Sequence, residues 1–278
     1  YYDENGFMEI ETPDLIKSTP EGARDYLVPS RVHPGCFYAL PQSPQLYKQL
    51  LMMSGCDRYM QVARCFRDED LRADRQPEFT QIDMEMSFVD ENDVMTLNEG
   101  LVKRVFKDVL DYDVPTPFER LTFNEAMARF GSDKPDTRFG LELCDLSDLL
   151  QNCEFKVFAG ALEKGSVRAI NAKGAASVFT RKEIDKLTEV VKLYKAKGLA
   201  WMKVAESGQF EGGISKFYAG KESEICSKLS AEKNDLLLFV RDENWWLACT
   251  PLGAVRKQLG RDLNLYNPND AFHFAWII

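Results

Sequence analysis

The segment covering residues 58–89 most constrains the fold of this chain, because two runs of alternating polar and apolar residues flank a short charged loop. Residues 58–66 and 78–89 both have the two-residue period of a β-strand. In the second run, one face carries Thr80, Ile82, Met84, Met86 and Phe88, and the other carries Phe79, Gln81, Asp83, Glu85 and Ser87. We therefore predict a long hairpin whose second strand buries the apolar face and presents amide and carboxylate groups on the other.

Arginines gather around the turn of this predicted hairpin, although this half of the chain is acidic. Residues 1–120 carry 13 basic and 23 acidic side chains, and the whole chain has a formal net charge of −9. Such a composition argues against a broad basic surface for nucleic acid. The exception is the local group Arg64, Arg67, Arg72 and Arg75. A solvated loop of ion pairs is the simpler interpretation of a charge run of this kind.

The remaining pattern predicts an α+β chain with antiparallel strands. Ser43 and Pro44 are expected to be the N-cap and first residue of a helix that ends at Gly55, and Asp90 is expected to cap the next helix. Residues 111–117 are typical of a linker. Beyond it, we predict a capped helix at 180–197, strands at 199–204, 236–240, 245–249 and 272–278, and a helix opening at 250–251.

The number and spacing of the cysteines and histidines indicate whether the chain binds zinc and in which cellular compartment it occurs. The chain has seven cysteines without a CxxC pair and only two histidines, which argues against a zinc site or a disulfide framework. Reduced thiols of this kind are typical of cytoplasmic proteins, so we expect that location. No segment approaches the roughly 20 apolar residues of a membrane helix, so we expect no membrane association.

Three ordered motifs in residues 1–90 carry a resemblance to a known family. Residues 66–83 (FRDEDLRADRQPEFTQID) resemble motif 2 of the class II aminoacyl-tRNA synthetases, and more narrowly of their bacterial-type aspartyl branch. Residues 18–31 (STPEGARDYLVPSR) resemble the flipping loop of that branch and the strand after it. Residues 40–51 (LPQSPQLYKQLL) resemble its amino-acid-binding helix, and residues 6–13 resemble the end of motif 1.

The resemblance implies an α+β fold, with part of a class II antiparallel-sheet catalytic core at residues 1–118. Residues 119–270 resemble, more loosely, the α+β insertion domain of the GAD type, and residues 271–278 would begin the return strand to the core. Because the chain begins at Tyr1 and ends in an apolar run, we expect an internal part of a longer enzyme. We expect this part to lack motif 3 and to be inactive alone in ATP–pyrophosphate exchange.

The activity implied by the resemblance is that of an aspartate–tRNA ligase, which activates L-aspartate with ATP and transfers it to the 3′ end of tRNA. ATP is then a substrate, and Mg²⁺ is expected with its ligands outside this chain; no metal-binding residue is assigned here. The implied partners are L-aspartate, ATP and the tRNA acceptor end, and the complete enzyme is expected to be a homodimer. Two alternatives remain open: a non-catalytic module that binds tRNA or protein, and a related asparaginyl or amide-forming class II ligase.

Adenylation brings an α-carboxylate to the α-phosphate of ATP, so a positive group must lie between two anions. Arg67 has the planar, always charged fork that this bridging needs, and the resemblance gives it that catalytic role. A salt bridge to Glu69 or Glu85 is the simpler interpretation of Arg67. The resemblance also implies an ATP pocket formed by Arg67, Asp68, Glu69, Gln76 and Phe79, with Phe79 stacking on adenine; core packing is the usual fate of such a phenylalanine.

A selective aspartate site needs a cation for the side-chain carboxylate and anions for the ammonium group. By resemblance, Lys48 binds the side-chain carboxylate, although an exposed lysine is the commoner outcome on a helix. The other residues implied in the aspartate site are Glu21, Ser43, Gln45, Arg67, Gln81 and Asp83. Arg72 and Arg75 are implied at the tRNA acceptor end, where they would contact phosphates. Ion pairs with Asp70 and Asp74 are the alternative for these two arginines.

Overall fold

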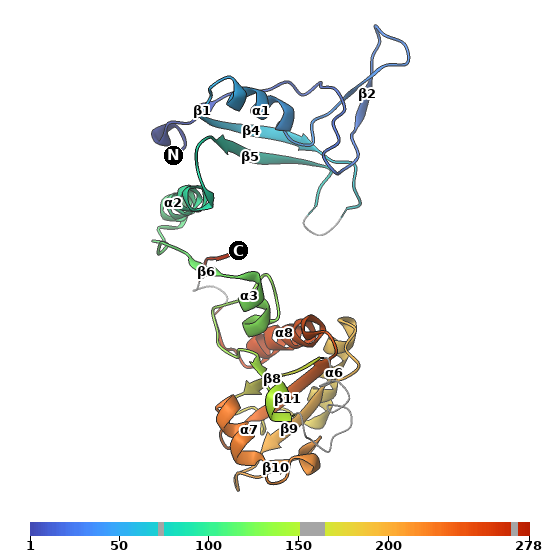
Figure 1. The fold of residues 1–278 in the computed structure, drawn as a ribbon, viewed down its shortest axis with the longest axis vertical. Helices are drawn as coiled ribbons and strands as arrows, with labels where there is room; N and C mark the ends of the chain where they lie inside the picture. Colours follow the sequence, from blue (N-terminus) through green and yellow to red (C-terminus); the bar gives the residue numbers. More distant parts are fainter. Residues whose placement is uncertain (72–74, 151–164, 268–271) are drawn as a thin grey trace. The chain divides into compact units, whose positions relative to one another are not determined.

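The computed structural model describes residues 1–71, 75–150, 165–267 and 272–278 of the chain (Figure 1). Its contacts divide the chain into two compact units, Tyr1–Pro117 and Phe118–Ile278. The boundary falls at the end of the predicted linker, residues 111–117. None of the helices in the described ranges is long and apolar enough to cross a membrane.

The first unit is built on a three-stranded sheet in the order β1-β4-β5. Strand β1 (Met8–Glu9) pairs parallel to β4 (Arg58–Phe66), which forms the predicted antiparallel hairpin with β5 (Glu78–Met86). Strands β2 (Leu27–Pro29) and β3 (Phe37–Ala39) form a separate two-stranded ribbon. A short 3₁₀ turn, η1 (Asp3–Asn5), precedes β1. Strand β4 has the predicted bounds, whereas β5 ends three residues before the predicted end at residue 89.

Two helices complete the first unit, and the capping prediction is correct for only one of them. Helix α2 (Glu91–Leu110) begins with a capping box in which the Asp90 side chain accepts from the backbone N–H groups of Asn92 and Asp93. Helix α1 (Gln45–Met53) has Pro44 at its N-cap and no side-chain cap. The prediction that Ser43 caps α1 is therefore wrong, because the helix begins one residue later than predicted and Ser43 lies before its N-cap. The Ser43 hydroxyl donates to a carboxylate on a neighbouring loop.

The two faces of the hairpin differ from the prediction in burial. Ile82 on the apolar face is 59% exposed, and Val62 on the same face of β4 is 55% exposed. The opposite face is the covered one: Tyr59, Ala63 and Cys65 of β4 are buried there. Helix α1 lies beside β4 and contacts both strands (Figure 1). Its Lys48 pairs with Asp83 on that covered face. The predicted alternation is thus confirmed, but the prediction that the hairpin buries its apolar face is wrong, because α1 covers the opposite face.

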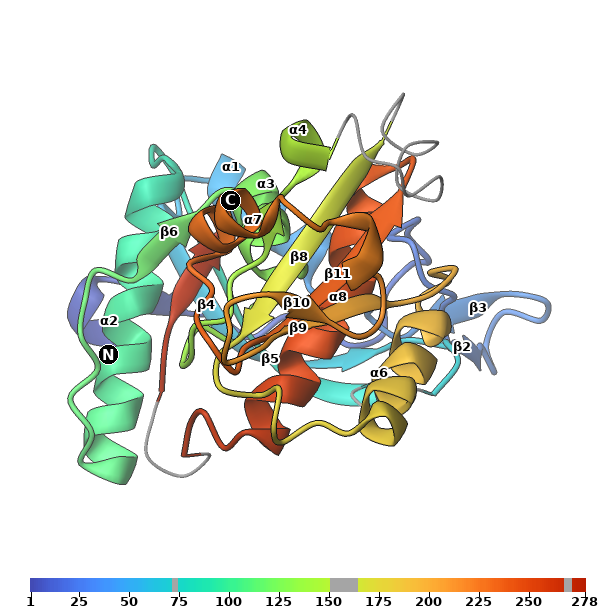
Figure 2. The ribbon, with the colours of Figure 1, turned by 90° about the horizontal axis from the view of Figure 1, so that it is seen from below.

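The second unit contains a five-stranded antiparallel sheet in the order β10-β9-β11-β8-β7. Its central strand, β11, is buried on both faces, which explains its unbroken apolar run LLLFV. Strands β8 and β11 lie side by side in Figure 2. The strands are β7 (Cys144–Asp145), β8 (Ser166–Ala172), β9 (Ala200–Val204), β10 (Phe210–Glu211) and β11 (Leu236–Asp242).

Helices supply a hydrophobic core on each side of this sheet. Leu236 and Leu238 of β11 belong to the core formed with helices α6 and α8, whereas Leu237 and Phe239 belong to the core formed with α4 and α7. The helices and turns of the unit are α3 (Phe123–Phe130), α4 (Ser147–Leu150), α6 (Arg181–Leu193), η2 (Ser215–Phe217), α7 (Glu222–Leu229) and α8 (Trp245–Asp262). Helix α6 has the predicted capping box at Thr180 and Glu183 but ends at Leu193.

The predicted strand at residues 245–249 is wrong, because these residues form the first turn and a half of α8. The side chain of Asn244 accepts from the backbone N–H of Trp246 and starts the helix there. Pro251 lies inside the helix and does not open it. The buried positions Ala248, Leu252, Val255 and Leu259 follow a helical spacing that extends through the two tryptophans. Aromatic residues favour strands locally, and the packing of α8 on the sheet overrides that preference.

The ends of the second unit meet in a parallel pair of short strands. Strand β12 (Ala275–Ile277) pairs with β6 (Glu119–Leu121), and the backbone N–H of Phe123 donates to the carbonyl of Ile278. Ile277 packs against Leu121 and Phe130. The strand predicted for the last residues is therefore confirmed at 275–277, and its partner lies in the second unit. Its role as a return strand stays a prediction.

Close packing of α3 against α8 predicts a large effect for one glycine. A Cβ atom added at Gly253 would lie 2.6 Å from the carbonyl oxygen of Gly131 and 2.7 Å from that of Phe130, and neither backbone atom can move freely. We expect Gly253→Ala to destabilise the second unit by about 2–3 kcal/mol. The measurement is the urea unfolding midpoint of the chain. Gly140→Ala is the matched control, since nothing lies within 4 Å of its added Cβ; equal midpoints for the two variants would contradict the packing argument.

Candidate active site

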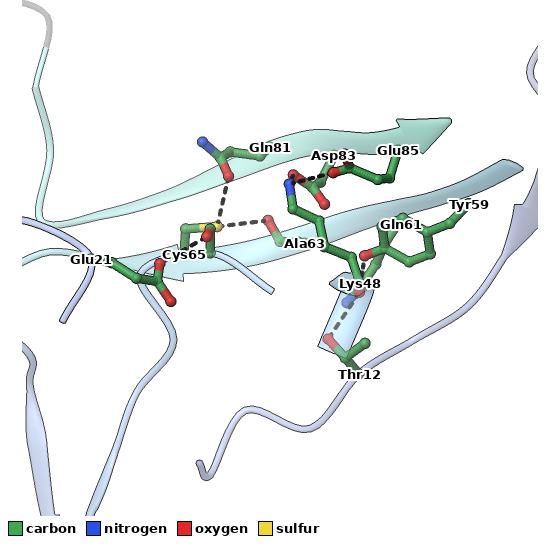
Figure 3. Close-up of polar contacts among 11 residues, drawn as sticks. Thr12, Glu21, Lys48, Tyr59, Gln61, Ala63, Cys65, Gln81, Asp83 and Glu85 are labelled. Carbon is green, nitrogen blue, oxygen red and sulfur yellow. Dashed lines mark hydrogen bonds and ion pairs between the residues drawn. The ribbon is translucent and has the colours of Figure 1, made fainter. Parts of the chain in front are cut away.

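Polar side chains gather on the covered face of the β4–β5 hairpin, beneath the first turn of α1 (Figure 3). The register pairs Gln61 with Asp83, Ala63 with Gln81, and Tyr59 with Glu85 across the two strands. Because alternate residues of a strand share a face, Phe79, Gln81, Asp83 and Glu85 form one row. Phe79 and Asp83 are four residues apart, which corresponds to about 13 Å along the strand. The row is therefore long enough to hold a ligand made of two joined parts.

Lys48 of α1 reaches the far end of this row. Its ammonium nitrogen Nζ lies 2.9 Å from Asp83 Oδ1 and 3.3 Å from Glu85 Oε2, and its side chain is only 12% exposed. Burial alone would lower the pKa of Lys48, but the hydrogen bonds and negative charges of Asp83 and Glu85 outweigh it and raise the pKa. Lys48 is therefore a charged ammonium held in place at neutral pH. Two of its three protons are engaged, and one remains for a further acceptor.

Gln81, in the middle of the row, is oriented by a thiol. The Sγ–H of Cys65 donates to Gln81 Oε1 at 3.3 Å, and Cys65 is completely buried (Figure 3). Burial raises the pKa of Cys65 to about 11, so the thiol keeps its proton and acts as a donor at neutral pH. With its oxygen accepting from Cys65, the Gln81 amide nitrogen is left as a donor for a ligand.

The loop before β2 is tied to the start of α1 by several hydrogen bonds. Ser43 Oγ donates to Glu21 Oε2 at 2.9 Å, and Thr19 Oγ1 donates to Glu21 Oε1 at the same distance. Gln42, which is 3% exposed, bonds both backbone groups of Ala23. This arrangement directs a carboxylate of the loop towards the first turn of α1. Gln45, the first residue of α1, is half-buried and has no side-chain hydrogen bond to any described residue.

A cavity of about 290 Å³ lies at the other end of the row, where β4 ends and β5 begins. The Arg67 guanidinium carbon lies 5.0 Å from the centroid of the Phe79 ring, close enough for a cation–π contact. In the described part of the chain, Arg67 has no salt bridge, because Glu69 pairs with Arg75 and Glu85 pairs with Lys48. The residues that line the cavity are Arg67, Glu69, Asp70, Leu71, Arg75, Gln76 and Phe79.

Most of the residues predicted for aspartate and ATP fall into two groups, and Gln45 and Asp68 lie outside them. The aspartate set of Glu21, Ser43, Lys48, Gln81 and Asp83 comes from the covered face and the loop above it. The nucleotide set of Arg67, Glu69, Gln76 and Phe79 lines the cavity. Asp68 is exposed and does not line it; its backbone N–H donates to the Arg24 carbonyl and joins the loop to the end of the hairpin.

The two arginines of the hairpin loop have different outcomes. Arg75 forms an exposed ion pair with Glu69 at 3.1 Å, which is neither of the partners considered from the sequence. It also lines the cavity. Arg72 lies outside the described residues. A tRNA contact by either one stays a prediction.

Four neighbours of the site were missed in the sequence: Glu85, Gln42, Tyr59 and Gln61. The parity of the strand already put Glu85 beside Asp83, so that signal was present in the sequence. Gln42 and Gln61 are buried polar residues, at 3% and 7% exposure, and only the tertiary structure identifies their partners. Buried amides of this kind nearly always hold something in place by hydrogen bonding.

The site has the charges that an adenylation site needs, but it offers no metal cage. No group of three or more His, Cys, Asp or Glu side chains that could hold a metal ion occurs among the described residues. A held ammonium and a carboxylate pair lie at one end of the row. At the other end lie an aromatic ring and a guanidinium that forms no salt bridge with any described residue. This arrangement suits a zwitterion with an acidic side chain beside a phosphorylated aromatic molecule.

Comparison with known proteins gives a consistent family match. The family described as tRNA synthetases class II (D, K and N) matches residues 1–278. The aspartate–tRNA ligase of Ruminiclostridium cellulolyticum is 61% identical over 279 residues, which cover 100% of this chain and 46% of that protein. The aspartate–tRNA(Asp/Asn) ligase of Treponema denticola is 58% identical over 274 residues, covering 98% of this chain and 46% of that protein. The chain spans slightly less than half the length of these curated relatives.

Among solved structures, the asparaginyl-tRNA synthetase of Entamoeba histolytica in complex with asparaginyl-adenylate matches 46% of this chain and 30% of that chain. The sequence identity is 22% and the TM-score is 0.38.

Proposed function

The chain belongs to the class II tRNA synthetases (D, K and N), and from this premise we propose that it carries the aspartate-activating site of an aspartate–tRNA ligase. In the proposed first step, an α-carboxylate oxygen of L-aspartate forms a bond to the α-phosphorus of ATP, and the bond to pyrophosphate breaks. In the second step, a hydroxyl at the tRNA 3′ end attacks the activated carbonyl carbon, and AMP leaves. Neither step requires a covalent bond to the protein.

The observation that carries this proposal is the buried ammonium of Lys48, held by Asp83 and Glu85. A carboxylate side chain of the substrate would accept a hydrogen bond from the third N–H group of Lys48. The nitrogen of a carboxamide side chain is itself a donor and would be repelled by that N–H group. This favours aspartate over asparagine as the amino acid. Glu21, Ser43, Gln45 and Gln81 complete the proposed aspartate site.

Arg67 has the second central role in the proposal. Its guanidinium has no carboxylate partner in the described residues and lies beside the Phe79 ring. It would bridge the carboxylate and the α-phosphate, and so reduce the repulsion between two anions as they approach. Asp68, Glu69, Gln76 and Phe79 complete the proposed ATP pocket. Mg²⁺ is proposed to accompany ATP, and no step here is assigned to it.

The remaining parts of the proposal concern the whole enzyme. Arg72 and Arg75 would contact the tRNA acceptor end, residues 119–270 would form the GAD-type insertion domain, and residues 271–278 would lead back to the catalytic core. The complete protein would act as a homodimer in the cytoplasm. These assignments rest on the family resemblance of residues 1–90, on the looser resemblance of residues 119–270 and on the relatives' names.

The proposal can be tested in a complete enzyme. We suggest a chimera in which this chain replaces the matching 279 residues of the Ruminiclostridium cellulolyticum aspartate–tRNA ligase. The chimera is expected to attach radiolabelled L-aspartate to tRNA from that organism, and not L-asparagine or L-lysine. A chimera that is folded and dimeric but charges asparagine in preference to aspartate would contradict the proposal.

A further inference from the structure

One carboxylate oxygen of the candidate site is buried without a partner. Asp83 Oδ1 accepts from Lys48, but Asp83 Oδ2 is buried and has no hydrogen-bond partner among the residues that the structure describes. The side chain is 11% exposed. Leaving a buried charged oxygen unsatisfied is costly, by about 1–3 kcal/mol or more. A hydrogen bond from a nearby donor to this oxygen would therefore stabilise the site.

A chain of buried polar groups ends beside Asp83. Thr12 Oγ1 donates to Gln61 Oε1 at 3.0 Å, and the Tyr59 hydroxyl donates to the same oxygen at 2.8 Å. Tyr59 has no exposed surface, and Gln61 is 7% exposed. Gln61 lies directly across the hairpin from Asp83, and both residues lie on the covered face with Tyr59 (Figure 3).

The Tyr59 hydroxyl has a single proton, and the charge of Asp83 acts on it. Burial raises the pKa of Tyr59 most strongly, and the negative charge of Asp83 raises the pKa further. The phenol therefore keeps its proton throughout the neutral pH range. It donates to Gln61 Oε1 in this structure, which leaves Asp83 Oδ2 as a second, unused acceptor.

Rotation of the Gln61 amide resolves this competition. A half turn exchanges the amide oxygen and nitrogen, so that the nitrogen donates to the oxygens of Tyr59 and Thr12. The Tyr59 proton is then free to turn to Asp83 Oδ2. In this second arrangement the Tyr59 hydroxyl donates to the carboxylate oxygen that is otherwise unsatisfied.

We propose that Tyr59 is a positioning residue for amino-acid recognition: its hydroxyl, set by Gln61 and Thr12, holds Asp83 and through it Lys48. This inference rests on the proposed aspartate site. When a substrate carboxylate takes a share of the Lys48 protons, Asp83 loses part of its hydrogen bonding, and the Tyr59 hydroxyl supplies the replacement. Tyr59 itself has no exposed surface and does not touch the substrate.

The test is Tyr59→Phe in the chimera, measured by ATP–pyrophosphate exchange at varied aspartate and varied ATP. We expect the KM for aspartate to rise about tenfold, which corresponds to about 1.4 kcal/mol. The kcat is expected to stay within twofold, with the KM for ATP unchanged. Tyr38→Phe is the matched control, because Tyr38 is 43% exposed on β3 and has no side-chain hydrogen bond to a described residue.

Other outcomes separate this inference from the function on which it rests. A rise in both KM values together with a lower melting temperature would mean a purely structural role and would overturn it, as would a Tyr59→Phe variant that matches Tyr38→Phe. If Tyr59→Phe does not fold, Thr12→Val decides: a rise of about twofold in the aspartate KM supports the inference, and no change rejects it. An unsubstituted chimera without aspartate-dependent exchange would instead reject the proposed function.

Discussion

Replacing Arg67 with alanine is expected to lower aspartate-dependent ATP–pyrophosphate exchange by about 10³-fold in the chimera. The guanidinium is the charge proposed to lie between the aspartate carboxylate and the α-phosphate, and removal of one such stabilising group costs about 10²–10³ in other enzymes. The loss should appear mainly in kcat, because Arg67 acts most strongly as the two anions approach each other. Arg67→Lys keeps the charge but loses the planar fork, so it should recover only part of the rate.

Arg64→Ala is the matched control for this prediction. Arg64 lies near the end of β4, three residues before Arg67, and forms an exposed ion pair with Glu78. An exposed pair of this kind contributes little to stability. Equal exchange rates for Arg67→Ala and Arg64→Ala would remove Arg67 from the proposed site.

The second large effect is expected for Lys48→Met, which should raise the KM for aspartate at least 100-fold. Two changes act in the same direction: the substrate carboxylate loses its ammonium partner, and Asp83 and Glu85 are left as unpaired carboxylates that repel it. The KM for ATP should change little. The measurement is exchange at varied aspartate, with Lys103→Met as the control because Lys103 is 46% exposed on α2.

The pH dependence of this pair has a definite sign. The pKa of Lys48 is raised above its usual value in the folded chain, so the stabilising contribution of its charge is fully present from neutral pH up to about 10.4. It is lost only as the pH rises through the raised folded value. The difference in the free energy of unfolding between the Lys48→Met chimera and the unsubstituted chimera should therefore be constant from pH 6 to pH 9. A difference that disappeared within this range would contradict the assignment of a charged Lys48.

The local alternation in residues 58–89 was sufficient to predict the hairpin and the row of site residues on it. Strand parity depends only on the backbone, so Phe79, Gln81 and Asp83 had to share a face once the strand was recognised. The alternation could not predict which face of the hairpin is covered, because burial depends on what packs against the sheet. Helix α1 supplies that cover through Lys48, and Ile82 on the other face is exposed.

Tertiary contacts also explain the local errors. Ser43 has a side chain that is common at N-caps, but in this structure its hydroxyl donates a charge-assisted hydrogen bond to the carboxylate of Glu21. The two tryptophans at the start of α8 favour a strand by themselves. They are helical because Asn244 caps the first turn of α8, which contains both of them. Buried partners such as Tyr59 and Gln61 have no sequence signal, since an isolated tyrosine or glutamine in a strand indicates nothing about its hydrogen bonds.

The most direct test of the account is amino-acid-dependent ATP–pyrophosphate exchange by the unsubstituted chimera. The account predicts exchange with L-aspartate, with L-asparagine and L-lysine at least 100-fold less effective at equal concentration, because the buried Lys48 ammonium selects a carboxylate side chain. Exchange that is as fast with asparagine as with aspartate would contradict the account, since Lys48 and Asp83 would then not determine which amino acid is activated.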